Sequence, residues 1–171
     1  TTVVRSDSIR MAPGLSLQWL ETVPSQDALV LGADIAIPIP RTREDTDYLR
    51  ATLGAAPFAL RPEGSVAALG TSGWLSFLQA ENRSVTWVEE NPDVVDAFAS
   101  RDLLDGVRPR AEVARRFLSA SGEQYVIIVL EAASTGGDAV GEDYTLTVGG
   151  LRRALDRLGP SGILAVPLRL Q

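Results

Sequence analysis

Residues 126–130 read Val-Ile-Ile-Val-Leu, five β-branched or large aliphatic residues in succession. A short, continuous apolar run of this kind is typical of a strand that is covered on both faces, as the strands of a parallel sheet are. From residue 65 onward, strand-like runs alternate with stretches of helical periodicity. The expected strands are 65–69, 84–88, 110–113, 126–130 and 162–168, and the expected helices are 74–80, 92–99, 115–120 and 144–158. This alternation predicts an α/β fold with a Rossmann-like, doubly wound, mostly parallel sheet.

Two local signals predict helix ends. Asn91 followed by Pro92 is the usual pattern of an N-cap and a first helical residue, so the second helix should begin there. The pair Gly159-Pro160 predicts the end of the last helix, because Gly commonly terminates helices and Pro cannot continue them.

The first sixty residues contain extended, turn-punctuated chain instead of this alternation. We expect extended segments at 16–23 and 28–39, followed by a short helix at 48–56 that Pro57 ends. We therefore expect an N-terminal β-rich element with one short helix, 1–60, and a Rossmann-like domain, 61–171.

Composition excludes several classes of chemistry. The net charge of −6 argues against a nucleic-acid partner, since binding to a phosphate backbone rests on clustered basic residues. The 16 basic residues are all Arg, and the absence of Cys, His and Lys excludes thiol nucleophiles, Schiff bases and an ordinary zinc site. We therefore expect no metal, and any catalysis must depend on carboxylates, hydroxyls, backbone amides or a bound cofactor. No apolar run approaches the roughly 18 residues that cross a bilayer.

In a doubly wound sheet, ligands bind beyond the carboxyl ends of the strands. The turn after the first of these strands contains Gly70, Ser72 and Gly73, where backbone could approach an anion or a nucleoside. Glu89 ends the next strand about twenty residues later, a spacing that suits a carboxylate accepting hydrogen bonds from ribose hydroxyls. Both features also occur in purely structural turns and strand ends, so the two interpretations remain open.

Four acids follow the apolar run at 126–130: Glu131, Asp138, Glu142 and Asp143. A carboxylate cluster at this edge could attract a cationic amine and act as a general base toward it. Acids in a Gly-rich loop are also commonly solvated and without a chemical role.

The chain resembles the spermidine/spermine synthase (polyamine aminopropyltransferase) family, within the class I S-adenosylmethionine-dependent methyltransferase-like fold. It looks most similar to a divergent bacterial branch in which such a domain is attached to membrane-spanning helices. The resemblance covers most of the chain from Ala12 onward. It rests on the order and spacing of APGLSL at 12–17, VAALGTSG at 66–73, VEENPDVV at 88–95, RRFL at 115–118, YVIIVL at 125–130, EDYTLT at 142–147 and LGPSGILAV at 158–166.

This resemblance implies decarboxylated S-adenosylmethionine, or S-adenosylmethionine, as co-substrate and a small cationic amine as acceptor. Gly70, Ser72 and Gly73 would lie against the nucleoside, and Glu89 would hold its ribose. Glu112 would read the adenine amino group, and Glu131 would accept the proton during aminopropyl transfer. It also implies a cytoplasmic domain of a parent protein that is attached to a membrane. The start at Thr1, without an initiator Met, agrees with a fragment of a larger chain.

The chain departs from the family pattern at three places. Trp74 stands where backbone should approach the ligand, Glu112-Val113-Ala114 replaces an acid-containing Gly-Asp pair, and Glu131 stands where the family has an Asp-rich stretch. These departures keep two alternatives open: a catalytically inactive binding or interaction domain, and a plain methyltransferase. The sheet is also expected to stop after its fifth strand, and an open edge favours pairing with another chain, such as a homodimer.

Overall fold

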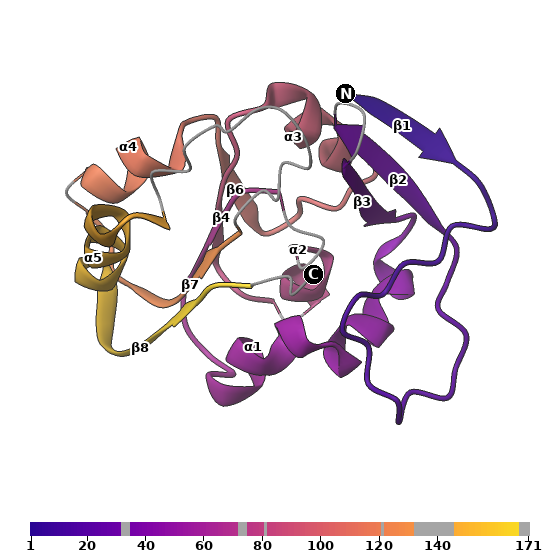
Figure 1. Ribbon diagram of the computed structural model, residues 1–171, viewed down its shortest axis with the longest axis horizontal. Helices are drawn as coiled ribbons and strands as arrows, with labels where there is room; N and C mark the ends of the chain where they lie inside the picture. Colours follow the sequence, from indigo (N-terminus) through magenta and orange to yellow (C-terminus); the bar gives the residue numbers. More distant parts are fainter. Residues whose placement is uncertain (32–34, 72–74, 81, 121, 132–145, 168–171) are drawn as a thin grey trace.

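The structure of the protein is a computed structural model (Figure 1). It describes residues 1–31, 35–71, 75–80, 82–120, 122–131 and 146–167. The main element is a five-stranded sheet in the order β6-β5-β4-β7-β8, in which every neighbouring pair is parallel. Its strands are β4 (Val66–Leu69), β5 (Val85–Val88), β6 (Val107–Arg110), β7 (Tyr125–Leu130) and β8 (Leu158–Ala165).

The strand order confirms the expected doubly wound fold. From β4 the chain adds β5 and β6 on one side and then β7 and β8 on the other, so the direction of winding reverses between β4 and β7. The strands β4 and β5 are buried along their whole length, and β7 is buried except at Val126. This double coverage explains why these strands read as continuous apolar runs.

Alternate residues of the central strands belong to two separate hydrophobic cores, one on each face of the sheet. Ile127 and Val129 contribute to the first core, whereas Ile128 and Leu130 contribute to the second. The first core includes residues of α2 (Leu75–Ala80) and α3 (Pro92–Ala99), and the second includes residues of α4 (Ala114–Ser119) and α5 (Val148–Asp156). The helices therefore cover both faces of the sheet, with α4 and α5 on the side away from the N-terminal element (Figure 1).

The N-terminal element is an antiparallel sheet in the order β1-β2-β3. It is followed by two 3₁₀ helices and a short α-helix. The elements are β1 (Thr2–Arg5), β2 (Gln26–Leu31), β3 (Ile35–Pro40), η1 (Arg43–Ala51), η2 (Leu53–Ala55) and α1 (Ala56–Leu60). Leu29, Ile39, Tyr48 and Phe58 belong to the same core as the first face of the parallel sheet. The two parts of the chain thus share apolar contacts, and the division at residue 60 stays a prediction.

Two expectations for the N-terminal part are wrong. Residues 16–23 form no strand, and Leu17 and Leu20 are 99% and 94% exposed. Apolar residues suggested a strand there, but a strand also needs a partner with which to pair. The helix expected at 48–56 is a pair of 3₁₀ helices, and Pro57 lies in the first turn of α1 instead of ending a helix. A first-turn proline is well tolerated because its missing N–H would have no partner in the helix.

Three boundaries in the parallel sheet also differ from expectation. The third strand is Val107–Arg110, not 110–113. It contains Pro109, which is tolerated because β6 is an edge strand. The last helix ends at Asp156, and β8 begins at Leu158, so Gly159-Pro160 lies inside the other edge strand. The two residues fall where the register between β7 and β8 shifts, between the pairs Tyr125–Leu158 and Ile127–Ile163, so the strand accommodates them at an irregularity.

Candidate functional site

The carboxyl ends of β4, β5 and β7 bring together three of the residues singled out in the sequence. The N–H of Gly70 donates to the carbonyl oxygen of Val88 at 2.9 Å, and the N–H of Glu131 donates to that of Leu69 at 2.9 Å. The first residues after these three strands consequently lie side by side at one edge of the sheet. This edge is next to the reversal of strand order, where doubly wound folds bind ligands.

Gly70 has a conformation and surroundings that require glycine. Its φ of 99° lies in the left-handed region, and a Cβ there would lie 2.9 Å from the carbonyl oxygen of Glu131. The carbonyl oxygen of Gly70 accepts a hydrogen bond of 2.8 Å from Nε1 of the buried Trp87. The turn after β4 is thus held tightly against β5 and the start of the loop after β7.

Glu89 is the buried polar centre of this edge. Glu89 is 6% exposed, and both of its carboxylate oxygens accept hydrogen bonds from other residues of the chain. Oε2 accepts from the Thr71 hydroxyl at 2.5 Å, and Oε1 accepts from the N–H of Asn91 at 2.9 Å. The carboxylate therefore joins the turn after β4 to the beginning of α3.

Asn91 confirms the predicted start of α3. Its Oδ1 accepts from the N–H of Asp93 at 3.0 Å, which satisfies one of the free amides of the first turn. Its Nδ2 donates to the hydroxyl of Thr1 at 3.2 Å. The beginning of the N-terminal element therefore lies at the same edge as Glu89.

Glu112 lies beside Glu89, in the loop after β6. The N–H groups of both residues donate to the carbonyl oxygen of Arg110, at 3.0 and 3.1 Å. The side chains of Glu112 and Glu131 are half-buried, and Glu90 is exposed. The edge thus holds acids from three loops, which can accept hydrogen bonds from hydroxyl and amino groups. Among the described residues, no group of three or more acids is arranged to hold a metal ion.

Several residues named in the sequence analysis lie outside the described residues. These are Ser72, Gly73, Trp74, Asp138, Glu142 and Asp143. Thr71 was not singled out in the sequence, although it contacts Glu89 directly. A hydroxyl beside Gly70, in the turn that faces the expected ribose-binding acid, is the signal that could have found it.

Two hollows lie in or beside the N-terminal element. The larger, about 690 Å³, lies between the segments 14–19 and 50–59. The smaller, about 390 Å³, is lined by Arg5, Asp27, Arg41 and Arg101. Neither is lined by Gly70, Glu89, Glu112 or Glu131.

The helices give no sign of a membrane span. In the portion of the chain that the structure describes, no helix has both the length and the apolar character needed to cross a bilayer.

No known family profile matches the chain, and no curated protein matches it. Solved structures that resemble it include human methyltransferase-like protein 13 in complex with SAH, at 13% identity and a TM-score of 0.48 over 63% of this chain and 55% of that one. Another is the glycopeptide N-methyltransferase MtfA with S-adenosyl-L-homocysteine, at 22% identity and a TM-score of 0.48 over 66% and 46%. A third is the N-methyltransferase NodS from Bradyrhizobium japonicum, at 15% identity and a TM-score of 0.46 over 67% and 62%. The chain therefore spans less than two thirds of the length of each of these three structures.

Proposed function

We propose that this chain is the nucleoside-binding part of a transferase that uses S-adenosylmethionine or a related sulfonium nucleoside. The observation that carries the proposal is the buried carboxylate of Glu89 at the end of β5, hydrogen-bonded to the turn that follows β4. A carboxylate at this position of a doubly wound fold suits the hydroxyls of a ribose.

Glu89 has the capacity to hold a ribose in addition to its present partners. A carboxylate offers about four acceptor positions, and among the described residues two are used, by Thr71 and by Asn91. A ribose hydroxyl would take the place of the Thr71 hydroxyl on Oε2 or share that oxygen with it. Gly70 allows the close approach of the backbone that a nucleoside needs.

The acids on the neighbouring loops would complete the site. Glu112, whose N–H shares the carbonyl oxygen of Arg110 with the N–H of Glu89, would face the base of a nucleoside held by Glu89 and accept from an exocyclic amino group. Glu131 begins the loop after β7 and would accept a proton from the acceptor amine. In the reaction, the amine nitrogen attacks the carbon beside the sulfonium, and the C–S electron pair goes to sulfur. The products are a thioether nucleoside and an alkylated amine.

The transferred group is either aminopropyl or methyl. The resemblance noted in the sequence implies aminopropyl transfer to a polyamine. Methyl transfer to another acceptor uses the same nucleoside site and has less need of an Asp-rich stretch, which this chain lacks after β7. Analysis of the reaction products therefore distinguishes aminopropyl transfer from methyl transfer.

A specific observation also favours a second candidate, a binding or interaction domain without catalysis. Glu89 is almost completely buried, and its two oxygens already have donors from Thr71 and Asn91. In such a domain the Glu89 contacts would only hold the edge of the sheet together.

Calorimetric titration with 5′-methylthioadenosine and S-adenosylmethionine separates the two candidates. We expect the wild-type protein to bind and Glu89→Gln to bind at least tenfold more weakly, because an amide accepts at only one of its two ends. Glu90→Gln is the matched control, since it removes the neighbouring exposed acid. Binding that is equal in both variants would contradict a ribose site at Glu89, and no binding to any of the three proteins would favour the second candidate.

If nucleoside binding is found, the transferred group is identified by mass spectrometry. The protein is incubated with putrescine and either decarboxylated S-adenosylmethionine or S-adenosylmethionine. An aminopropylated amine would support the first reaction and a methylated amine the second.

A further inference from the structure

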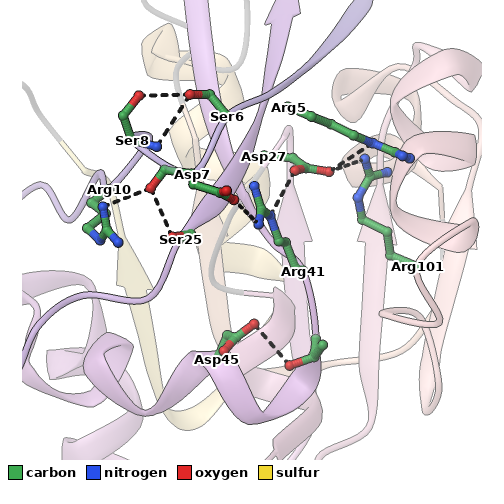
Figure 2. A network of polar contacts seen from close by, with 11 residues as sticks. Arg5, Ser6, Asp7, Ser8, Arg10, Ser25, Asp27, Arg41, Asp45 and Arg101 are labelled. Carbon is green, nitrogen blue, oxygen red and sulfur yellow. Dashed lines mark hydrogen bonds and ion pairs between the residues drawn. The ribbon is translucent and has the colours of Figure 1, made fainter.

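The smaller hollow is lined by four charged residues from separate parts of the chain, and it lies away from the candidate nucleoside site. Arg5 ends β1, Asp27 is in β2, Arg41 follows β3, and Arg101 follows α3. Figure 2 shows the three guanidinium groups around the carboxylate of Asp27. With a volume of about 390 Å³, the hollow is at the small end of the range for small-molecule sites.

Two of the arginines hold Asp27 firmly. Asp27 is 4% exposed, and its Oδ2 accepts from Nη2 of Arg101 at 2.8 Å. Its Oδ1 accepts from Nε of Arg41 at 3.2 Å. Burial by itself would raise the pKa of Asp27, but the hydrogen bonds from Arg101 and Arg41 outweigh it, so the pKa is lowered. The carboxylate is therefore ionised and already paired.

Arg5 is placed differently from the other two. Its Nε lies 3.6 Å from Oδ2 of Asp27, which is within reach of an ion pair but beyond hydrogen-bond distance. Its side chain is 79% exposed. Asp27 thus leaves the guanidinium fork of Arg5 available at the mouth of the hollow.

The lining of the hollow carries excess positive charge. Three arginines face one aspartate, which sums to +2. Asp7, which is mostly exposed, accepts from Nη1 of Arg41 at 2.7 Å and lowers the sum to +1. This excess is found in a chain whose overall net charge is −6. An anion that entered the hollow would balance the charge of the arginines that Asp27 and Asp7 do not neutralise.

We propose that this hollow binds the phosphate group of a small phosphorylated molecule. Guanidinium forks bind phosphate through pairs of parallel hydrogen bonds, and a phosphate group offers these forks more acceptor oxygens than a carboxylate does. Arg5 would supply the main fork from the exposed side. Arg41 and Arg101, oriented by Asp27, would form the base of the site.

This site is separate from the proposed nucleoside site. Asn91, at the start of α3, lies at the edge that holds Glu89, whereas Arg101 follows the other end of the helix. Eight helical residues span about 12 Å. The proposal consequently does not depend on the proposed function.

Isothermal titration of the whole chain with inorganic phosphate, at an ionic strength matched with sodium chloride, tests the proposal. We expect wild-type protein to bind phosphate, and Arg5→Gln to bind it roughly tenfold more weakly, because one bidentate charged contact is lost. Arg5→Lys should give an intermediate affinity, since it keeps the charge but loses the fork. Arg116→Gln, an exposed arginine on α4, removes the same charge elsewhere and should bind as the wild type does.

The Arg5 side chain is exposed, so its substitution should leave the fold intact, and an unfolding curve of each variant checks this. The ¹⁵N-detected Nε–H signals of Arg5, Arg41 and Arg101 should shift on titration and locate the bound ion. Equal phosphate affinity of Arg5→Gln and Arg116→Gln would overturn the proposal. So would acetate binding as tightly as phosphate, or the absence of any heat beyond that of matched sodium chloride.

Discussion

Two buried carboxylates organise two different regions of the protein. Glu89, at the edge of the parallel sheet, has neutral donors, the Thr71 hydroxyl and the Asn91 amide. Asp27, in the N-terminal sheet, has three arginines around it. Among the described residues the donors to Glu89 are neutral, whereas the arginines more than balance the charge of Asp27. The first region is therefore suited to ligands with hydroxyl or cationic groups, and the second to anions.

The difference also concerns how each carboxylate stabilises the fold. Asp27 connects β2 to Arg101 beyond α3, so it links the N-terminal element to the Rossmann-like part by an ion pair. Glu89 connects loops within the Rossmann-like part by hydrogen bonds alone. Removing one cation from a buried carboxylate takes away a charge-assisted hydrogen bond, which costs more than leaving a neutral donor unsatisfied.

Among the substitutions considered, Arg101→Ala should therefore lower the free energy of unfolding the most. The side chains of Arg101 and Asp27 are 10% and 6% exposed, so the substitution leaves a buried carboxylate with one fewer partner. We expect the free energy of unfolding to fall by about 3 kcal/mol. Urea denaturation measures it, with Arg5→Ala as the control that removes an exposed arginine from the same cluster. If both variants lose equal stability, Asp27 and Arg101 do not link the two parts of the chain.

A smaller effect is expected for Glu89→Ala. This variant leaves the Thr71 hydroxyl and the Asn91 N–H without their acceptor, and we expect it to lower the free energy of unfolding by about 2 kcal/mol. Glu90→Ala, at the exposed neighbouring position, should change it by less than about 0.5 kcal/mol. If Glu89→Ala lowers the free energy of unfolding as much as Arg101→Ala does, neutral donors stabilise a buried carboxylate as strongly as arginines do, and the distinction between the two regions is wrong.

The smallest effect concerns acid stability. The folded-state pKa of Asp27 is lowered from the ordinary value of 3.8, so its ionised form favours the folded state. The contribution is complete above the unfolded pKa and is lost as the pH falls through the folded pKa. We expect the difference in unfolding free energy between wild type and Asp27→Asn to be constant near neutral pH and to decrease below 3.8. Denaturation curves across this range measure it, and Asp47→Asn, at an exposed position, is the charge-matched control. A difference that stayed constant through this range would contradict an ionised Asp27 in the fold.

Much of the parallel sheet could be predicted from the sequence, because burial on both faces leaves a local pattern. The runs at 66–69, 85–88 and 125–130 are apolar, apart from the buried Thr86, because their apolar side chains belong to one of the two cores. The edge strands could not be placed in the same way. Pro109 in β6 and Gly159-Pro160 in β8 are signals against regular structure. Pro109 is tolerated at an edge, and Gly159-Pro160 lies at an irregularity of the pairing between β7 and β8.

The candidate site was predictable in part. Gly70 and Glu89 stand at strand ends that the pattern located, and the structure places them side by side. The contact of Thr71 with Glu89 depends on the parallel pairing of β4 with β5, which brings residues 18 apart in sequence together. No local sequence pattern indicates which two strands will pair.

By itself, the sequence determined the α/β class, the central strands and the start of α3, because each depends on neighbouring residues and on whether they are buried. Only the tertiary structure decided the cluster around Asp27. Its members, Arg5, Asp27, Arg41 and Arg101, stand far apart along the chain and in four different segments. Charge interactions act through space and carry no periodicity, so the folding of the N-terminal sheet against α3 is what brings these side chains to one place.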